Sequence, residues 1–197
     1  MSEGSYMRID EKTNPIDSLE RALIFLREAE KDLMSMKWFV VAIHHAIYHF
    51  MLLALSNTDQ SGIWKEPIIR RSDGLIDLMH PENRLISFMT VLKFIQDSAR
   101  MSGYVNSKPF QAKPYHAQSM KRLNDRLRNV FVHYKPLAWS IHDKYILDVI
   151  NPGLEIIEFL VEKSGRCRLD QEEVDYIIGI INKIGKIIDK YYEKQTK

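Results

Sequence analysis

The stretch WFVVAIHHAIYHFMLLAL, residues 38–55, decides the fold class. It contains no Asp, Glu, Lys or Arg, and it is about long enough to cross a bilayer as a helix. The same run carries His44, His45 and His49 near its middle, and hydrocarbon tolerates histidine poorly. We therefore favour a helix buried on most sides of a helical bundle over a membrane span.

The composition is typical of one globular domain. Of the 197 residues, 45% are hydrophobic and 27% are charged, which argues against a disordered, collagen-like or mucin-like chain. The single cysteine, Cys167, excludes an intramolecular disulfide framework and a cysteine zinc cluster, and it fits a reducing cytoplasm. The first residues, MSEGSY, lack a basic start followed by an apolar core. We therefore expect no signal peptide and a cytoplasmic protein.

Hydrophobic spacing and prolines predict an all-α fold, a single bundle of about five to six helices. Pro15, Pro114 and Pro152 each stand just before a helical pattern, where the missing N–H of proline costs nothing. The expected helices span residues 15–34, 37–56, 81–102, 114–135, 152–163 and 170–194. Residues 1–14 are expected to form an N-terminal arm, and residues 15–197 one domain with its core at about 15–165.

Three local features complete this expected fold. The first helix should bury a stripe made of Leu19, Leu23, Leu26 and Leu33. The last helix, an addition to the core, starts at Asp170 with Glu173 three residues on, which is close to a capping box. Between the fourth and fifth helices, Trp139–Ile141 and Tyr145–Leu147 flank a polar triplet, and we expect a small β-hairpin there.

Several motifs of enzymes and metal sites fail on spacing. Residues 179–186 are one residue too long for a phosphate loop, and Ile187 stands where Ser or Thr is required. His45 and His49 have metal-ligand spacing on a helix, but no acidic residue lies within that helix to complete a site, so packing or hydrogen-bonding histidines are favoured. A hydrolase triad is unsupported, since the chain has no Gly-x-Ser-x-Gly elbow. We therefore expect no metal site and no cofactor.

Positive charge is concentrated in residues 100–145. This segment holds nine basic and two acidic side chains, a net +7, whereas the whole chain nets only +2. A one-sided concentration of this kind is expected for a protein that binds a polyanion, although a solvated helix face would also produce it. The segment includes the expected helix 114–135, which makes that helix the first candidate for contacts with nucleic acid.

The expected helix 114–135 has two distinct faces. At about 100° per residue, one stripe should face the core: Leu123, Leu127, Val130 and Tyr134. The opposite side carries Arg122, Asp125, Arg126, Asn129 and His133. Asn129 and His133 are one turn apart and can touch, whereas Arg128 lies about 140° around from His133. Arg128 and His133 should therefore not pair within one helix, although both can line a surface cleft.

The run Arg128-Asn129-Val130-Phe131-Val132-His133 resembles the Arg–polar–three–His signature of the HEPN superfamily, the higher eukaryotes and prokaryotes nucleotide-binding domain. HEPN domains are helical bundles that carry this motif near the end of a late helix, as expected here. The early helices also look similar, particularly residues 42–49. The resemblance covers about residues 15–165, and the hairpin and the last helix depart from the minimal bundle.

The resemblance implies a metal-independent endoribonuclease, of the kind found in toxin–antitoxin and other defence systems. By this resemblance His133 would move a proton, Arg128 would stabilise the phosphate, and Asn129 would orient His133 or the phosphate. The RNA would be held through flanking phosphates by Lys121, Arg122, Arg126 and Lys135. The implied partners are RNA and an antitoxin such as a small nucleotidyltransferase.

Two other functions remain open from the sequence. A HEPN-like module could bind a nucleotide, RNA or a protein without catalysis, and a helical interaction protein could have no role with nucleic acid. The local +7 charge favours the first two functions over the third. The resemblance also implies a homodimer whose site straddles the two-fold axis, with an exposed Val132 packed against its symmetry mate.

Overall fold

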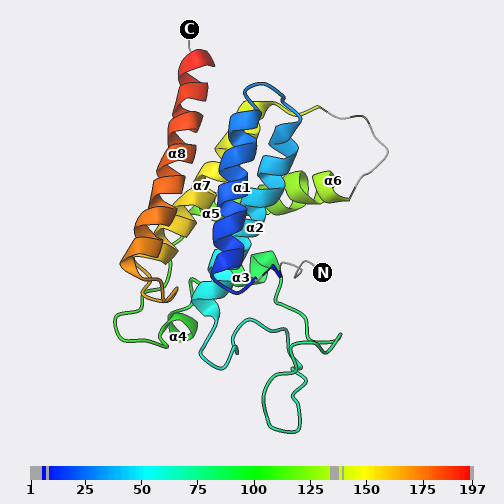
Figure 1. The fold of residues 1–197 in the computed structure, drawn as a ribbon, viewed down its shortest axis with the longest axis vertical. Coiled ribbons are helices and arrows are strands. Elements are labelled where there is room, and N and C mark those ends of the chain that lie inside the picture. The colour runs from blue at the N-terminus through cyan, green and yellow to red at the C-terminus, as the bar shows by residue number, and fades with distance from the viewer. Residues whose placement is uncertain (1–5, 8, 134–137, 139, 196–197) are drawn as a thin grey trace, which may run out of the picture.

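The computed structural model describes residues 6–7, 9–133, 138 and 140–195. Within these residues helices are the only regular elements longer than an isolated bridge, and they gather into one bundle (Figure 1). The predicted all-α fold is confirmed, with more and shorter helical segments than the five to six expected. The expected arm 1–14 overlaps the first helix, which already begins at Thr13.

Helices α1 (Thr13–Glu28) and α2 (Ser35–Leu55) form the centre of the bundle. Leu19, Leu23 and Leu26 are buried, as the stripe predicts. Leu33 is 58% exposed, contrary to prediction, because α1 ends at Glu28 and residues 29–34 turn toward α2. The apolar periodicity continued beyond the point where the helix stops.

Helix α2 is the core helix that the uncharged stretch predicts. Phe39, Ile43, Ile47 and Phe50 are fully buried along it, under α1 and α7 (Asp143–Glu162). Among the described residues it is the one helix long and apolar enough to span a membrane, and 67% of its apolar window is buried inside the protein. The neighbouring helices therefore cover most of the surface that a lipid would otherwise contact.

The expected helix 81–102 is wrong. Its place is taken by two short helices, α3 (Phe88–Phe94) and α4 (Ser98–Met101). The Ser87 hydroxyl caps α3 by accepting the Thr90 N–H, and the Asp97 carboxylate caps α4 by accepting the N–H groups of Ala99 and Arg100. These side chains satisfy N–H groups locally, so they start new helices where the hydrophobic pattern alone suggests one.

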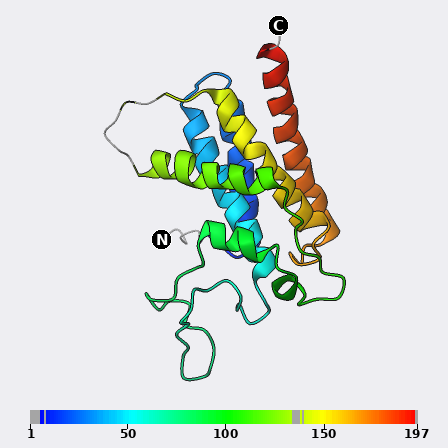
Figure 2. The same cartoon turned by 180° about the vertical axis from the view of Figure 1, so that it is seen from behind.

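The expected helix 114–135 is continuous but not uniform. It comprises α5 (Pro114–Arg122), a π-helical segment η1 (Leu123–Arg128) and α6 (Asn129–Val132), and this rod crosses α2 (Figure 2). Pro114 occupies the first turn as predicted. Leu123 and Leu127 are buried as predicted, and Val130 is half-buried. Tyr134, the last member of the expected stripe, lies outside the described residues.

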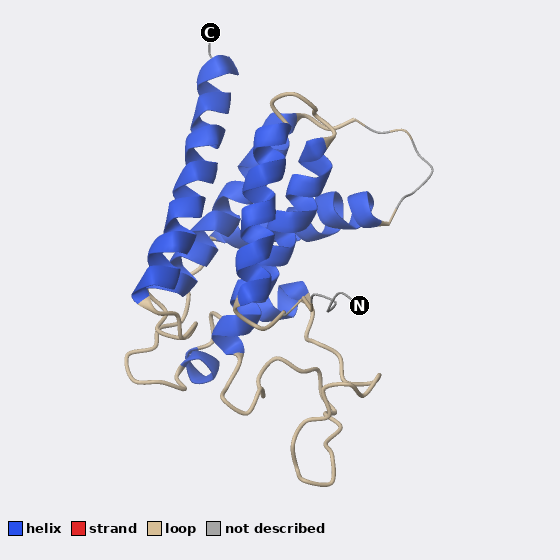
Figure 3. Ribbon diagram, in the orientation of Figure 1, coloured by secondary structure: helices blue, strands red, loops and turns tan. Residues whose placement is uncertain are grey.

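The expected β-hairpin and the expected helix start at 152 are both wrong. Helix α7 begins at Asp143, nine residues earlier than expected, and includes Tyr145–Leu147 (Figure 3). His142 Nδ1 accepts the Lys144 N–H, which caps the helix before the residues that resemble a strand. Pro152 lies buried inside the helix instead of starting it. Trp139, in the expected first strand, lies outside the described residues.

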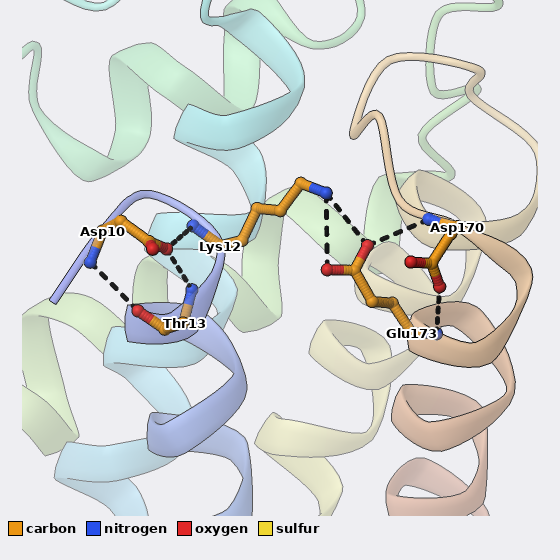
Figure 4. Close-up of polar contacts among 5 residues, drawn as sticks. All are labelled: Asp10, Lys12, Thr13, Asp170 and Glu173. Atoms are coloured by element: carbon orange, nitrogen blue, oxygen red, sulfur yellow. Dashed lines mark hydrogen bonds and ion pairs between the residues drawn. The ribbon is translucent and has the colours of Figure 1, made fainter. Parts of the chain in front are cut away.

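The N-termini of α1 and α8 (Gln171–Gln195) are capped and joined (Figure 4). Asp10 Oδ1 accepts the N–H groups of Lys12 and Thr13 at 3.0 and 2.8 Å. At α8 the predicted capping box is confirmed, because Asp170 Oδ1 accepts the Glu173 N–H and Glu173 Oε2 accepts the Asp170 N–H. Lys12 Nζ lies 3.0 Å from Glu173 Oε2, and this ion pair links the two helix starts.

A buried arginine ties the loop before α8 to the end of α2. Arg166 is fully buried; its Nε donates to the Ala54 carbonyl at 2.8 Å and its Nη2 to Asn57 Oδ1 at 3.2 Å. The guanidinium also lies over the Tyr104 ring, 4.7 Å from its centroid. Arg166 thereby satisfies a carbonyl that the last turn of α2 leaves without a helical partner.

Candidate functional site

An open pocket of about 530 Å³ lies between α1, α2 and η1. Aromatic side chains form part of its wall, and its polar groups come from all three helices. These polar groups are Asp17, Ser18 and Arg21 from α1, His44, His45, Tyr48 and His49 from α2, and Asn124 and Arg128 from η1. The pocket therefore places the motif arginine opposite the histidines of the core helix.

Arg128 is half-buried and lines this pocket, where the sequence placed it on the flank of an exposed surface. Its Nη1 donates to Asn129 Oδ1 at 2.9 Å. The π-helical turn that ends at Arg128 holds more residues than an α-turn, so it rotates this side chain relative to a 100° spacing. The rotation accounts for the difference from the predicted direction.

Asn124 connects η1 to α2 through His44. His44 Nε2 donates to Asn124 Oδ1 at 3.1 Å, and Asn124 Nδ2 donates to Asp125 Oδ1 at 2.8 Å. The His44 ring stacks on Phe88 with centroids 4.4 Å apart. Burial is the main cause that lowers the pKa of His44 to about 4, and the charge of Arg128 lowers this pKa further. His44 is therefore neutral at pH 7.

His45 and His49 stack one turn apart, with ring centroids 4.1 Å apart. His45 Nδ1 lies 2.7 Å from Ser18 Oγ, and His49 Nδ1 lies 3.3 Å from Asn14 Nδ2. Burial, then the charge of His45, lowers the pKa of His49 to about 4, and burial followed by the charge of Arg128 lowers the pKa of His45. The prediction that these histidines pack and form hydrogen bonds is confirmed.

His133 is exposed and is not among the residues that line the pocket. Its backbone N–H donates to the Asn129 carbonyl at 2.9 Å, and it ends α6. Asn129 uses its side chain to accept from Arg128. Within one chain, the structure therefore brings Arg128 and Asn129 together and leaves His133 outside the pocket.

The other basic residues expected at an RNA site lie on a separate surface. Lys121, Arg122 and Arg126 are exposed around a hollow of about 480 Å³ that shares no lining residue with the histidine pocket. Lys121 pairs with Asp125 across one turn, which neutralises part of this surface. Lys135 lies outside the described residues.

The described residues contain no group of three or more His, Cys, Asp or Glu side chains arranged to hold a metal ion. Cys167 is buried, and burial raises the pKa of its thiol to about 12, so it is not a ready nucleophile. The polar chemistry of the pocket therefore rests on neutral imidazoles, amides and guanidinium groups.

Sequence reasoning missed Ser18 and Asn124 and did not connect the α2 histidines with Arg128. The available signal was three histidines in an otherwise uncharged helix, because such groups need polar partners when they are buried. The partners are 27 and 80 residues away in the chain from the histidines they bind, so no local pattern identifies them.

Comparisons of the chain with protein-family models, with curated proteins and with solved structures gave no match.

Proposed function

We propose that this protein is a metal-independent endoribonuclease of the HEPN type, acting as a cytoplasmic toxin or defence effector. The observation that supports this most is the position of Arg128. This arginine belongs to the motif run 128–133 and lines an open pocket together with histidines that are neutral at pH 7. A guanidinium beside neutral imidazoles is suited to holding a phosphate next to groups that transfer protons.

In the proposed reaction the RNA 2′-hydroxyl attacks the adjacent phosphorus. The O2′–P bond forms, the P–O5′ bond breaks, and the products are a 2′,3′-cyclic phosphate and a 5′-hydroxyl. Arg128 would donate hydrogen bonds to the non-bridging oxygens as negative charge develops on them. Asn129 would keep the guanidinium in place through the 2.9 Å hydrogen bond, and His133 would transfer a proton at one of the reacting oxygens.

The proposed active form is a homodimer. His133 does not line the pocket that holds Arg128, so a second copy related by a two-fold axis would have to bring its histidine to that pocket. Val132, 44% exposed next to His133, offers an apolar contact for such an interface. Lys121, Arg122 and Arg126 would bind flanking phosphates, and a small nucleotidyltransferase is the proposed antitoxin.

Two single variants test the catalytic proposal. We expect Arg128→Ala and His133→Ala each to abolish RNA cleavage while helix content and melting temperature stay near wild type, since surface substitutions rarely cost more than about 0.5 kcal/mol. Arg84→Ala, on an exposed loop position, is the matched control. The assay follows a labelled RNA on a denaturing gel and identifies the 3′ end of the product. Variants that cut RNA as fast as wild type would refute the proposal.

The dimer is tested by sedimentation and by mixing. A species near the 23.2 kDa monomer mass at all micromolar concentrations would contradict it. In a mixture of Arg128→Ala and His133→Ala chains, a heterodimer has one site with both wild-type groups, so part of the activity should return. No recovery in a mixture shown to exchange subunits would argue against a shared site.

A non-catalytic module that binds RNA, a nucleotide or a protein is the second candidate. The exclusion of His133 from the pocket favours it, because a single chain then presents an anion-binding arginine without the motif histidine. Wild-type protein that retains RNA on a filter but leaves it uncut would support this function over the first.

A further inference from the structure

The hydrogen-bond partners of His45 determine which of its ring nitrogens carries the proton. Ser18 Oγ lies 2.8 Å from the Asn14 carbonyl oxygen and 2.7 Å from His45 Nδ1. A carbonyl oxygen only accepts hydrogen bonds, so the single hydroxyl proton of Ser18 goes to Asn14. Ser18 Oγ then accepts from His45 Nδ1–H, and the lone pair of the neutral ring is on Nε2.

The two neighbouring histidines are held in other arrangements. His44 Nε2–H donates to Asn124 Oδ1, and this ring is 8% exposed, so it is not available to a substrate. The Asn14 amide donates from Nδ2 to His49 Nδ1, so the proton of His49 is on Nε2. Of the three α2 histidines, His45 is the one that is both half-buried at the pocket and fixed with a basic Nε2.

We propose that His45 is a further catalytic residue of this pocket: the general base that takes the proton from the RNA 2′-hydroxyl. This inference rests on the proposed ribonuclease function. The proton moves from O2′ to His45 Nε2 as the O2′–P bond forms and the P–O5′ bond breaks. His133 then has the other task and supplies a proton to O5′. Ser18 is a positioning residue, because it holds the imidazole through Nδ1.

The charges around His45 keep it in its basic form at neutral pH. Burial lowers its pKa from 6.5, the Arg128 charge on η1 lowers it further, and the Asp17 carboxylate on α1 opposes them. Arg21 from α1 and His44, Tyr48 and His49 on α2 are the other titratable groups of the pocket. A base with a lowered pKa gives a kcat/KM that rises with pH and levels off below pH 6.5.

The test separates a base from an acid by changing the leaving group of the substrate. A ribo-oligonucleotide has a poor leaving group that needs a proton, whereas uridine 3′-(4-nitrophenyl phosphate) releases a stable phenolate that does not. Both substrates need the proton removed from O2′. Loss of the base therefore slows both reactions, and loss of the acid slows only the first.

We expect His45→Gln to lower kcat/KM about 10²–10⁴-fold on both substrates and to remove the rising limb of the pH profile. His133→Ala should lose activity on the oligonucleotide and recover on the nitrophenyl ester. Ser18→Ala, which keeps the imidazole, should show a smaller loss than His45→Gln on both substrates. His80→Gln, on the loop before α3, is the control.

The outcomes distinguish this inference from the proposed function. If Arg128→Ala is inactive and His45→Gln matches wild type, His45 is not the base and the ribonuclease proposal stands. If His45→Gln recovers on the nitrophenyl ester, it acts on the leaving group and the assignment is overturned. Should His45→Gln fail to fold, by its circular dichroism, Ser18→Ala decides: an unchanged rate on both substrates overturns the inference. Wild-type protein that cleaves neither substrate overturns both proposals.

Discussion

The stability of this protein should fall between pH 7 and pH 5 because of two histidines on α2. Burial lowers the pKa of His44 and of His49 from 6.5 to about 4. The unfolded chain therefore binds protons, as the pH drops through 6.5, that the folded chain refuses until pH 4. Stability from this source is fully present above pH 6.5 and is lost progressively as the pH falls toward 4.

The magnitude follows from the two pKa values of each histidine. At pH 5 the difference corresponds to about 2 kcal/mol in the free energy of unfolding per histidine relative to pH 7, or about 4 kcal/mol for both. This is a large part of the 5–15 kcal/mol that is typical of a domain, so the transition midpoint should shift visibly.

The assay is urea unfolding, followed by circular dichroism at several pH values and one protein concentration. We expect the double variant His44→Gln/His49→Gln to lose much less stability than wild type between pH 7 and pH 5, whatever its stability at pH 7. His133→Gln, at an exposed position, should follow wild type. If wild type is equally stable at both pH values, or if the double variant declines as steeply, the histidines are not held neutral by burial.

Three further predictions concern packing and metal. A Cβ on Gly153 would lie 2.3 Å from Ile47 Cδ1, so Gly153→Ala should cost about 1–3 kcal/mol, whereas Gly179→Ala on α8, with nothing within 4 Å, should gain about 0.5–1 kcal/mol; equal effects in urea unfolding would contradict this packing. Arg166→Met should lower the free energy of unfolding by at least about 2 kcal/mol, because it removes the hydrogen bonds to the end of α2, and a neutral result in the same assay would show that they add no net stability. RNA cleavage should persist in excess EDTA; a rate restored only by magnesium, with 3′-hydroxyl products, would refute the proposed mechanism.

The part of the fold that is encoded locally could be predicted from the sequence. The uncharged stretch at 38–55 identifies the core helix, Pro114 marks a helix start, and Asp170 with Glu173 forms the expected capping box. Each of these signals acts within one or two turns, where hydrophobic period and N–H satisfaction are sufficient. Errors came where a local cap competed with the apolar period, as at Asp97, and where proline was accepted inside a helix, as at Pro152.

The candidate site was predicted only in part, for a physical reason. The sequence picks out Arg128, Asn129 and His133 as chemically suited residues, but their directions depend on the π-helical turn, in which the usual 100° spacing fails. The partners of the α2 histidines, Ser18 and Asn124, come from other helices, and only the packing of α1 and η1 against α2 brings them into hydrogen-bond distance. The sequence by itself determined an all-α bundle and the residues able to do chemistry; the tertiary structure decided which of them share a pocket, because hydrogen bonds and burial between distant segments leave no periodic trace in the chain.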